Sequence, residues 1–503
     1  MNYDKIRRMN KLRFIALPLL LISISACSTN NNSSNPSSGS SDTSESTPSG
    51  SSSQSSSSSS SSYVPILSER NPMNEPQVHN QYYLNHIGDI YNTWKSYQGD
   101  GITIAVIDKG FKYDHEDFVY ENNQSKVSEL SAAFTTTGTS TSIQVGRNKV
   151  SAGTNDNAHG TFCAGVAAAG INGKGVIGIA PLAELMLLKT DGHPLSINEA
   201  FRYAADNGAK VITISIGSYS DYDGDLTYNS QSRPNLTTVF NDAVNYCRNK
   251  NVAVISAAGN GGLYSDSSRR TQKTWPGATP GVIGAAGLAA DKSNIAWSGS
   301  SLNPNNTSNA VFCDVFAPAD GMYGCTDHRN DYNNYYKYDG GWMGTSFASP
   351  IVAGIAALYF EKNPNNTVAQ FEEDLYASCA PMKASTGVST SQLGHGRVDV
   401  GKLLGTSYKG NISIKIQNTG PLKAHIWNSI TDVSETSWNN NPPLSKNGNY
   451  YNCTVNTNNF DSVIFHDDST QTIEIYASSF IYNNVYNLDV DGGSPFIGRY
   501  IAN

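Results

Sequence analysis

Four residues that lie far apart in the chain have the types that nucleophilic catalysis requires. Ser346 lies in a GTSFASP segment, and Asp108, His159 and Asn260 precede it in that order. A serine hydroxyl is a weak nucleophile unless a base takes its proton and a third group orients that base. Donors must also stabilise the oxyanion that forms on the attacked group. A histidine, an aspartate and an asparagine can fill these roles, so the set predicts attack by Ser346 on a carbonyl carbon.

The residues that follow Ser346 predict a buried helix. No charged residue occurs in residues 346–360. The segment has many alanines and glycines, whose small side chains let other elements pack close to it. A helix that is apolar on every side is normally buried. Pro350 falls in the first turn, where a helix tolerates proline because the missing N–H has no intrahelical partner there. We therefore expect Ser346 at the positive end of a buried helix dipole, which stabilises developing negative charge.

The other three residues each adjoin a predicted element. Residues 102–107 have the β-branched pattern of a strand that is buried on both faces, and Asp108 ends it. His159 opens the segment HGTFCAG, whose small residues suit a tightly packed helix, and Asn260 follows a second buried strand, 252–259. Strands that alternate with helices in this way predict an α/β fold with a mostly parallel sheet flanked by helices.

These motifs resemble those of the subtilisin-like serine proteases, the subtilases of family S8. The resemblance covers about residues 75–405, its most specific part is GTSFASP followed by PIVAG, and the order Asp, His, Ser is that of subtilisin. It implies a subtilisin-like fold and a serine endopeptidase. In that enzyme Asp108 orients His159, His159 takes the proton of Ser346, and Asn260 holds the oxyanion together with the Ser346 N–H. No cofactor is implied for the chemistry.

The resemblance also identifies two segments as the walls of the main specificity pocket. One of them pairs with an extended substrate, so backbone pairing would hold a protein or peptide while side-chain pockets read its sequence. The two walls are Ser215, Ile216 and Gly217 on one side and Ala257, Ala258 and Gly259 on the other.

Two features depart from the family pattern. Lys109 stands where the family usually has serine or threonine. Because side chains alternate along a strand, we expect Lys109 to point away from His159 into solvent; the alternative is that its cation competes for Asp108. Residues 218–235 are an insertion rich in tyrosine and aspartate beside the pocket, and it is either a solvated loop or a determinant of specificity.

Asp117 and Asn172 lie at the spacings that the family uses for ligands of a structural calcium ion. Calcium takes oxygen ligands from side chains and carbonyl groups, so the pair predicts a structural Ca²⁺ site. The alternative is an ordinary surface aspartate and a turn asparagine. Among the cysteines, Cys313 and Cys325 flank a turn and are the pair that we expect to form a disulfide, while Cys163 is expected as a buried thiol.

The amino-terminal residues predict export and anchoring. Residues 1–27 combine a positive stretch with a short apolar run that ends in ISAC, which resembles a bacterial lipoprotein signal. Cys27 would then carry a lipid, and the serine-rich residues 28–62 would form a flexible tether. The protein would be anchored at the bacterial cell surface, on the outer face of the cytoplasmic membrane. The alternative is an ordinary cleaved signal with an incidental cysteine.

The arm that begins at residue 63 follows the tether directly, which leaves no room for a folding propeptide. Residues 63–406 are expected to form the peptidase domain. Residues 407–503 show short alternating strands, which predict a small β-sandwich. This part resembles starch-binding modules, so Trp427 and Trp438 would stack on the sugar rings of a glucan; the alternative is that both are core residues.

The expected function is a surface-anchored serine endopeptidase that acts on extracellular proteins or peptides, in a narrower version on one exported peptide. The alternative from another class is a catalytically inactive adhesin that binds glycans and uses the protease fold as a scaffold. The net charge of −8 argues against a nucleic-acid partner, because such partners require a positive surface.

Overall fold

The structure is a computed structural model, and it describes residues 71–153, 157–219, 236–290, 294–305, 311–329 and 335–418. It further describes 420–428, 431, 433–435, 442–467, 475–481, 485–487 and 499–500. These residues belong to one compact unit, Pro65–Asn503. The predictions for Cys27, the serine-rich tether, residues 220–235 and Trp438 lie outside the described residues.

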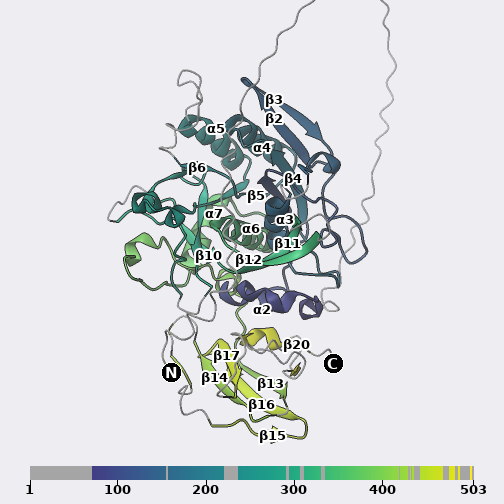
Figure 1. The fold of residues 1–503 in the computed structure, drawn as a ribbon, viewed down its shortest axis with the longest axis vertical. Helices are drawn as coiled ribbons and strands as arrows, with labels where there is room; N and C mark the ends of the chain where they lie inside the picture. The colour runs from purple at the N-terminus through teal and green to yellow at the C-terminus, as the bar shows by residue number, and fades with distance from the viewer. Residues whose placement is uncertain are drawn as a thin grey trace, which may run out of the picture. The chain divides into compact units, whose positions relative to one another are not determined.

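An eight-stranded sheet forms the centre of the fold (Figure 1), with the strand order β10-β9-β7-β5-β1-β4-β2-β3. Every neighbouring pair is parallel except β2 and β3. The strands are β1 (Thr103–Asp108), β2 (Ala132–Thr137), β3 (Ser140–Val145), β4 (Glu184–Thr190), β5 (Val211–Ile214), β7 (Ala253–Ala257), β9 (Ile283–Leu288) and β10 (Val315–Pro318). The predicted mostly parallel α/β sheet is confirmed.

Helices cover both faces of this sheet, as the runs of apolar residues in its strands require. The helices are α2 (Ile90–Thr93), α3 (Ala158–Ala168), α4 (Pro194–Asp206), α5 (Leu236–Asn249), α6 (Thr345–Lys362), α7 (Val368–Ser378) and α8 (Val400–Leu404). Alternate residues of one strand enter different cores: Val106 of β1 packs with α3 and α6, and Ile107 packs with α4 and α5. The helix pairs lie on opposite sides of the sheet in Figure 1.

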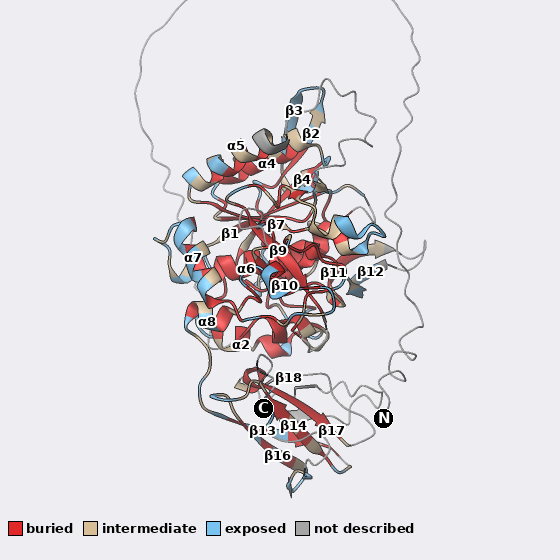
Figure 2. Cartoon of the chain, turned by 90° about the vertical axis from the view of Figure 1, so that its left-hand side faces the viewer, coloured by how far each residue is buried: buried red, intermediate tan, exposed pale blue. Residues whose placement is uncertain are grey.

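The predicted buried helix is α6. Every residue from Thr345 to Phe360 is buried, and the helix is red over almost its whole length in Figure 2. Pro350 is the sixth residue of α6, so it lies in the second turn and not in the first as expected, and the helix lacks one backbone hydrogen bond there. The carboxyl-terminal charge, Lys362, stands in the last turn, where it complements the negative end of the helix dipole.

Two short antiparallel pairs lie outside the central sheet. The strands β11 (Met322–Arg329) and β12 (Tyr335–Trp342) form a hairpin that packs against α3. The strand β6 (Ser218–Tyr219), which continues the chain beyond β5, pairs with β8 (Thr274–Trp275). The 3₁₀ helices are Pro72–Asn74, Val78–Asn80, Tyr82–His86, Arg147–Lys149, Gly261–Leu263, Ser267–Thr271, Thr390–Gln392 and Ala477–Ile481.

The carboxyl-terminal residues form two further small sheets, with the orders β15-β16-β13-β19-β20 and β14-β17-β18. Apolar residues of both sheets share one core, for example Ile414 of β13 and Phe465 of β17, as the predicted sandwich requires. The strands are β13 (Asn411–Gln417), β14 (Lys423–Trp427), β15 (Lys446–Asn447), β16 (Tyr450–Asn456), β17 (Ser462–His466), β18 (Ile475–Tyr476), β19 (Val485–Asn487) and β20 (Arg499–Tyr500).

Two local details differ from expectation. Cys313 and Cys325 are free and buried, so the predicted disulfide is wrong: Cys313 belongs to the core around Phe312, and Cys325 packs against α3. The residues SINE, 196–199, have the pattern of a capping box, which would begin a helix after Ser196. The helix α4 begins earlier, at Pro194, and its cap is His193, because proline is well suited to the first helical position.

Among the described residues, no helix combines the length and the apolar character that crossing a membrane requires.

Candidate active site

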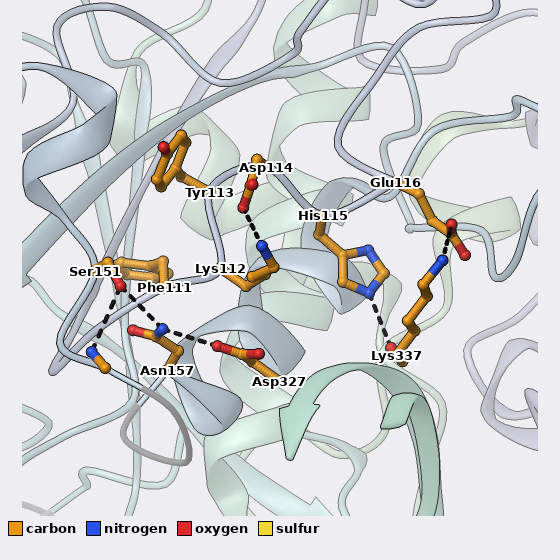
Figure 3. A pocket seen from close by; sticks show the side chains of 11 residues that line it. Phe111, Lys112, Tyr113, Asp114, His115, Glu116, Ser151, Asn157, Asp327 and Lys337 are labelled. Atoms are coloured by element: carbon orange, nitrogen blue, oxygen red, sulfur yellow. Dashed lines mark hydrogen bonds and ion pairs between the residues drawn. The ribbon is translucent and has the colours of Figure 1, made fainter. Parts of the chain in front are cut away.

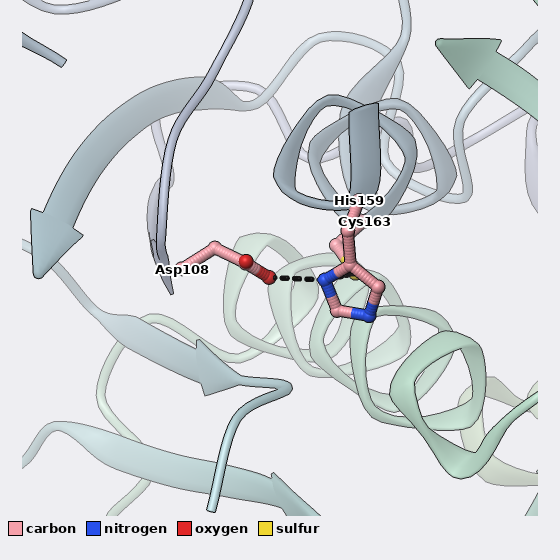
Figure 4. Close-up of side chains that lie close together, drawn as sticks. All are labelled: Asp108, His159 and Cys163. Atoms are coloured by element: carbon pink, nitrogen blue, oxygen red, sulfur yellow. Dashed lines mark hydrogen bonds and ion pairs between the residues drawn. The ribbon is translucent and has the colours of Figure 1, made fainter. Parts of the chain in front are cut away.

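The parallel sheet and α3 bring Asp108 and His159 together (Figure 4). Asp108 is the last residue of β1 and is 2% exposed, and His159 lies in the first turn of α3. The distance between Asp108 Oδ2 and His159 Nδ1 is 2.8 Å. Because a carboxylate accepts, this bond places the ring proton on Nδ1 and leaves Nε2 as the basic nitrogen. His159 is therefore oriented as a general base.

The charge on Asp108 also sets the basicity of His159. Burial by itself lowers the pKa of His159, but the negative charge of Asp108 and the hydrogen bond to it outweigh burial and hold the pKa well above its ordinary value. The imidazolium form that arises during proton transfer is stabilised by the same interaction.

This raised pKa predicts the pH dependence of catalysis. The ring must be neutral to accept a proton, so kcat/KM should fall as the pH decreases through the raised pKa of His159. In Asp108→Asn the stabilising charge is absent, so the acid limb should move to lower pH while the maximal rate drops by about ten-thousand-fold. The pH profiles of both proteins test this. An acid limb at the same pH in both would show that Asp108 does not control His159.

Ser346 lies beside this pair, at the start of α6. It is 9% exposed, and its hydroxyl donates to the carbonyl oxygen of Ser215 at 3.3 Å rather than to His159. Cys163 links the two sites: its Sγ is 3.4 Å from Ser346 O and 4.0 Å from His159 Nδ1. The hydrogen bond from a nucleophile to its base is often long before substrate binds. The shared contact with Cys163, and the ring of Phe347 at 5.9 Å from the ring of His159, place Ser346 in the neighbourhood of His159.

The groups that could hold an oxyanion surround Gly344. Asn260 Oδ1 accepts hydrogen bonds from Thr345 N and Oγ1, both at 2.9 Å, which leaves Nδ2 as a free donor. A methyl group added to Gly344 would lie 3.6 Å from Asn260 Nδ2 and 3.7 Å from both Ser346 N and Ser346 Oγ. One small space is therefore bordered by two N–H donors and the nucleophile. Glycine keeps it open, and its φ of 152° also favours glycine.

The two predicted pocket walls begin at the same edge of the sheet, because β5 and β7 are parallel neighbours. Ser215 is buried and donates through Oγ to Ser346 O at 2.7 Å. Ile216 is half-buried and Gly217 is exposed, so the segment becomes accessible beyond Ser215.

The segment that includes β8 contacts both walls. A Cβ on Gly217 would lie 2.5 Å from Trp275 O, and one on Gly259 would lie 2.6 Å from the methyl group of Thr274. Ala258 is buried, whereas Ala257 and Gly259 are half-buried. Both walls of the specificity pocket therefore pack against the same segment, which includes β8.

Lys109 is exposed, and its backbone N–H donates to Asp108 Oδ1 at 2.8 Å. The prediction that its side chain points into solvent is confirmed. The ion pair of Asp108 is made with His159 and not with Lys109, so this departure from the family pattern leaves the orientation of the histidine intact.

Asp117 has one property of a cation ligand. It is fully buried, its Oδ2 accepts from Val176 N at 3.0 Å, and its Oδ1 has no hydrogen-bond partner. Burial raises the pKa of Asp117 to about 6. Glu75 is 3% exposed. Burial and the charge of Asp117 raise its pKa to about 7, although the hydrogen bond from the Gly173 N–H acts in the opposite direction. Two neighbouring buried carboxylates are thus present, and oxygen donors of this kind suit calcium.

Asn172, the other predicted calcium ligand, makes hydrogen bonds to the surrounding backbone at both ends of its side chain. Its Oδ1 accepts from Lys174 N at 3.0 Å, and its Nδ2 donates to the carbonyl oxygens of Glu116 and Val119 at 3.2 and 3.3 Å. Both ends of the amide hold the turn, which is the alternative that the sequence left open. The second carboxylate, Glu75, escaped the sequence analysis because it comes from the amino-terminal arm and carries no motif.

Cys163 was expected only as a buried thiol, and its contacts with His159 and Ser346 were missed. The signal was present in its spacing: it follows His159 by four residues, which places both on one face of a helix. In the carboxyl-terminal part, Trp427 is 5% exposed and stacks on His425 with 5.1 Å between ring centroids. This burial matches the alternative that Trp427 is a core residue.

The chain was then compared with known proteins. The model of the subtilase family, Peptidase S8, matches residues 99–396, which include all four catalytic candidates. A calcium-dependent protease of Trichormus variabilis is 31% identical over 309 residues, which are 59% of this chain and 44% of the relative. The thermitase of Thermoactinomyces vulgaris is 27% identical over 294 residues, 57% of this chain and 84% of the relative.

The matched part spans less than half of the first two relatives, both calcium-dependent proteases, with 44% and 42% of their lengths. A subtilisin from a Bacillus species is 30% identical over 291 residues, 53% of this chain and 58% of the relative. Among solved structures, a protease from Pseudoalteromonas arctica gives a TM-score of 0.49 at 21% identity and covers 67% of this chain and 100% of that chain.

Proposed function

This chain belongs to the subtilase family of serine proteases, and we propose that it is an endopeptidase with Asp108, His159 and Ser346 as its catalytic triad. The observation that carries the proposal is the convergence of three independent segments. The bond of 2.8 Å between Asp108 and His159 orients the base, and the space bordered by Asn260 and Ser346 provides two donors beside the nucleophile.

In this mechanism the substrate lies extended along the wall that begins at Ser215, with its scissile carbonyl carbon at Ser346. Nε2 of His159 takes the hydroxyl proton as Ser346 attacks, and the ring charge is stabilised by Asp108. Asn260 Nδ2 and the Ser346 N–H donate to the oxyanion. His159 then protonates the leaving amine, and a water molecule hydrolyses the acyl-enzyme by the same steps in reverse.

Digestion of a peptide library derived from a proteome tests the proposal and gives the cleavage preference. Cleavage within peptides, lost in Ser346→Ala, is the expected result. The competing function is an inactive adhesin on a protease scaffold. The unobstructed space at Gly344 and the intact Asp108–His159 bond favour the enzyme, because a scaffold does not need either.

We further propose that calcium stabilises the fold through Asp117 and Glu75. A relative at 31% identity is named a calcium-dependent protease, and the unpartnered Asp117 Oδ1 offers a ligand atom. An ion that binds only the folded state adds stability by mass action, about 2.7 kcal/mol at a hundred times its Kd. A chelator should therefore lower Tm by several degrees.

The Asp117→Asn variant should lose this sensitivity to the chelator, whereas Asn172→Ala should keep it because Asn172 holds the turn. Thermal melts with chelator and with added calcium give the comparison. A wild-type Tm that responds to neither would remove the calcium site.

The location of the protein is proposed from the sequence alone. A lipid on Cys27 would anchor the chain at the outer face of the cytoplasmic membrane, and the serine-rich residues 28–62 would let the peptidase domain, residues 63–406, stand off the surface. Labelled fatty acid should enter the wild-type protein in bacteria and fail to enter Cys27→Ser. Equal labelling of both proteins, or labelling of neither, would contradict the anchor.

A glucan ligand for residues 407–503 also rests on the sequence. The burial of Trp427 leaves Trp438 as the aromatic residue on which stacking would depend. Titrating the full-length protein with soluble starch oligosaccharides, and repeating the titration with Trp438→Ala, tests this. Absence of binding by the wild-type protein would make these residues a structural or protein-binding module.

A further inference from the structure

A pocket of about 630 Å³ is lined by residues that follow β1 and by residues next to α3, the two elements that carry Asp108 and His159 (Figure 3). Its walls come from three segments: residues 111–116 after β1, the residues that lead into α3, and the β11–β12 hairpin. The proposed mechanism uses none of the side chains that line it. The pocket is therefore available to a part of the substrate that does not react.

Each wall continues a segment that carries a catalytic residue. Phe111 follows Asp108 by three residues, Asn157 precedes His159 by two, and β12 ends four residues before Ser346. A helix rises 1.5 Å per residue, so Asn157 lies about 3 Å along the axis from His159. An extended peptide advances about 3.3 Å per residue. The pocket is thus within reach of residues that adjoin the scissile bond.

The position of the pocket relative to the sheet indicates which side of the substrate it meets. The two walls of the specificity pocket begin at the ends of β5 and β7, which lie on one side of β1 in the sheet. The helix α3 packs over β1 and β4, on the other side, and the hairpin packs against α3. In Figure 1, β6 and β11 accordingly lie on opposite sides of α6. The proposed mechanism lays the substrate along those walls up to the scissile bond, and on that basis the pocket is assigned to the leaving-group side.

The charges in the pocket leave one carboxylate without a counter-ion. Lys112 Nζ pairs with Asp114 at 2.5 Å, and Lys337 Nζ pairs with Glu116 at 2.5 Å. Asp327 is 5% exposed, and one of its oxygens accepts from Asn157 Nδ2 at 2.8 Å.

Within the part of the chain that the structure describes, the ion pairs of the two pocket lysines are with Asp114 and Glu116, and none is with Asp327. The nearby ring of His115 is neutral, because its Nδ1 accepts the N–H of Asp117 and its Nε2 donates to the Lys337 carbonyl oxygen. Burying a carboxylate costs free energy unless a cation pairs with it. Asp327 therefore favours a positively charged ligand group.

The aromatic part of the pocket suits a side chain that has an apolar stem and a positively charged end. Phe111 and Tyr113 contribute aromatic rings to the pocket. The methylene groups of lysine or arginine pack along apolar surface while the charged end reaches a polar group, and aromatic faces attract such cations.

We propose that this pocket binds a lysine or arginine side chain of the substrate, on the leaving-group side and within about three residues of the scissile bond, with Asp327 as its counter-ion. The proposal rests on the endopeptidase function proposed above and adds a substrate preference to it.

Paired fluorogenic peptides test the subsite. Each pair is identical except for lysine or norleucine at one of the three positions after the scissile bond. At one of these positions we expect kcat/KM to be at least about ten-fold higher for lysine, and Asp327→Asn should reduce this ratio to about two-fold or less. Asp327→Glu should keep the preference, because the negative charge remains. Glu129→Gln is the control: Glu129 pairs with Arg147 and neither residue lines the pocket, so the ratio should stay.

The same peptides, labelled with a fluorophore, are also titrated against Ser346→Ala protein with and without Asp327→Asn. Tighter binding of the lysine peptide that depends on Asp327 supports the subsite even if turnover is absent. Cleavage of norleucine peptides without a lysine preference would overturn the subsite and leave the endopeptidase function intact. A lysine preference that persists in Asp327→Asn would also overturn it. Loss of all cleavage in the wild-type protein would instead contradict the endopeptidase function.

Discussion

Replacing Ser346 with alanine is expected to remove nearly all peptidase activity, and replacing His159 with alanine should do the same. The nucleophile and its base act as a unit, so either loss should lower kcat by on the order of a millionfold. The Ser346 hydroxyl makes one hydrogen bond, to the Ser215 carbonyl oxygen at 3.3 Å, so the alanine variant should fold normally. Hydrolysis of a fluorogenic peptide, measured on proteins with matching melting curves, tests the expectation.

Ser349→Ala is the matched control for this experiment. Ser349 is buried on the same helix, and its hydroxyl bonds with Thr213 Oγ1 at 2.7 Å. The variant removes a buried serine hydroxyl from α6 without touching the nucleophile, so activity should persist. Undiminished activity in Ser346→Ala would contradict the mechanism.

The second large effect is expected at Asn260. Replacing it with alanine removes one oxyanion donor while the nucleophile and base stay in place, so turnover should fall by about a hundred- to a thousand-fold, or roughly 3–4 kcal/mol. The alanine also removes the acceptor of Thr345 N. Asn260→Asp keeps that acceptor, replaces the donating Nδ2 and adds a negative charge that repels the oxyanion, so it tests whether the acceptor alone is sufficient.

We expect both variants to lose kcat while KM changes little, since the oxyanion exists only on the reaction path. Steady-state kinetics on one peptide gives both constants. A fall in activity in Asn260→Ala that Asn260→Asp restores would assign Asn260 to the support of Thr345 alone.

The parts of the site that could be predicted from the sequence are those that local patterns determine. The β-branched residues before Asp108 specify a strand that ends at that carboxylate, and the uncharged residues after Ser346 specify a buried helix. Parallel strands end at a common edge, which is why residues as distant as Asp108 and Asn260 could be assigned to one site before the structure was available.

The parts that could not be predicted depend on contacts between distant segments. Asp327 and Asn157 are 170 positions apart, and neither belongs to a pattern that indicates a pocket. The error about Cys313 and Cys325 has a similar origin, because proximity in the sequence does not place two side chains in one core. Glu75 belongs to an arm without periodicity, so only the fold reveals that the charge of Asp117 acts on it.

Reaction of the purified protein with a fluorophosphonate probe tests the central claim most directly, because such probes label a serine only when a base activates it. The wild-type protein should become labelled on Ser346, as located by mass spectrometry of the digested product. Ser346→Ala and His159→Ala should remain unlabelled, and labelling of the wild type should be lost at low pH as His159 becomes protonated. An unreactive wild-type protein, or labelling that persists in Ser346→Ala, would contradict the account.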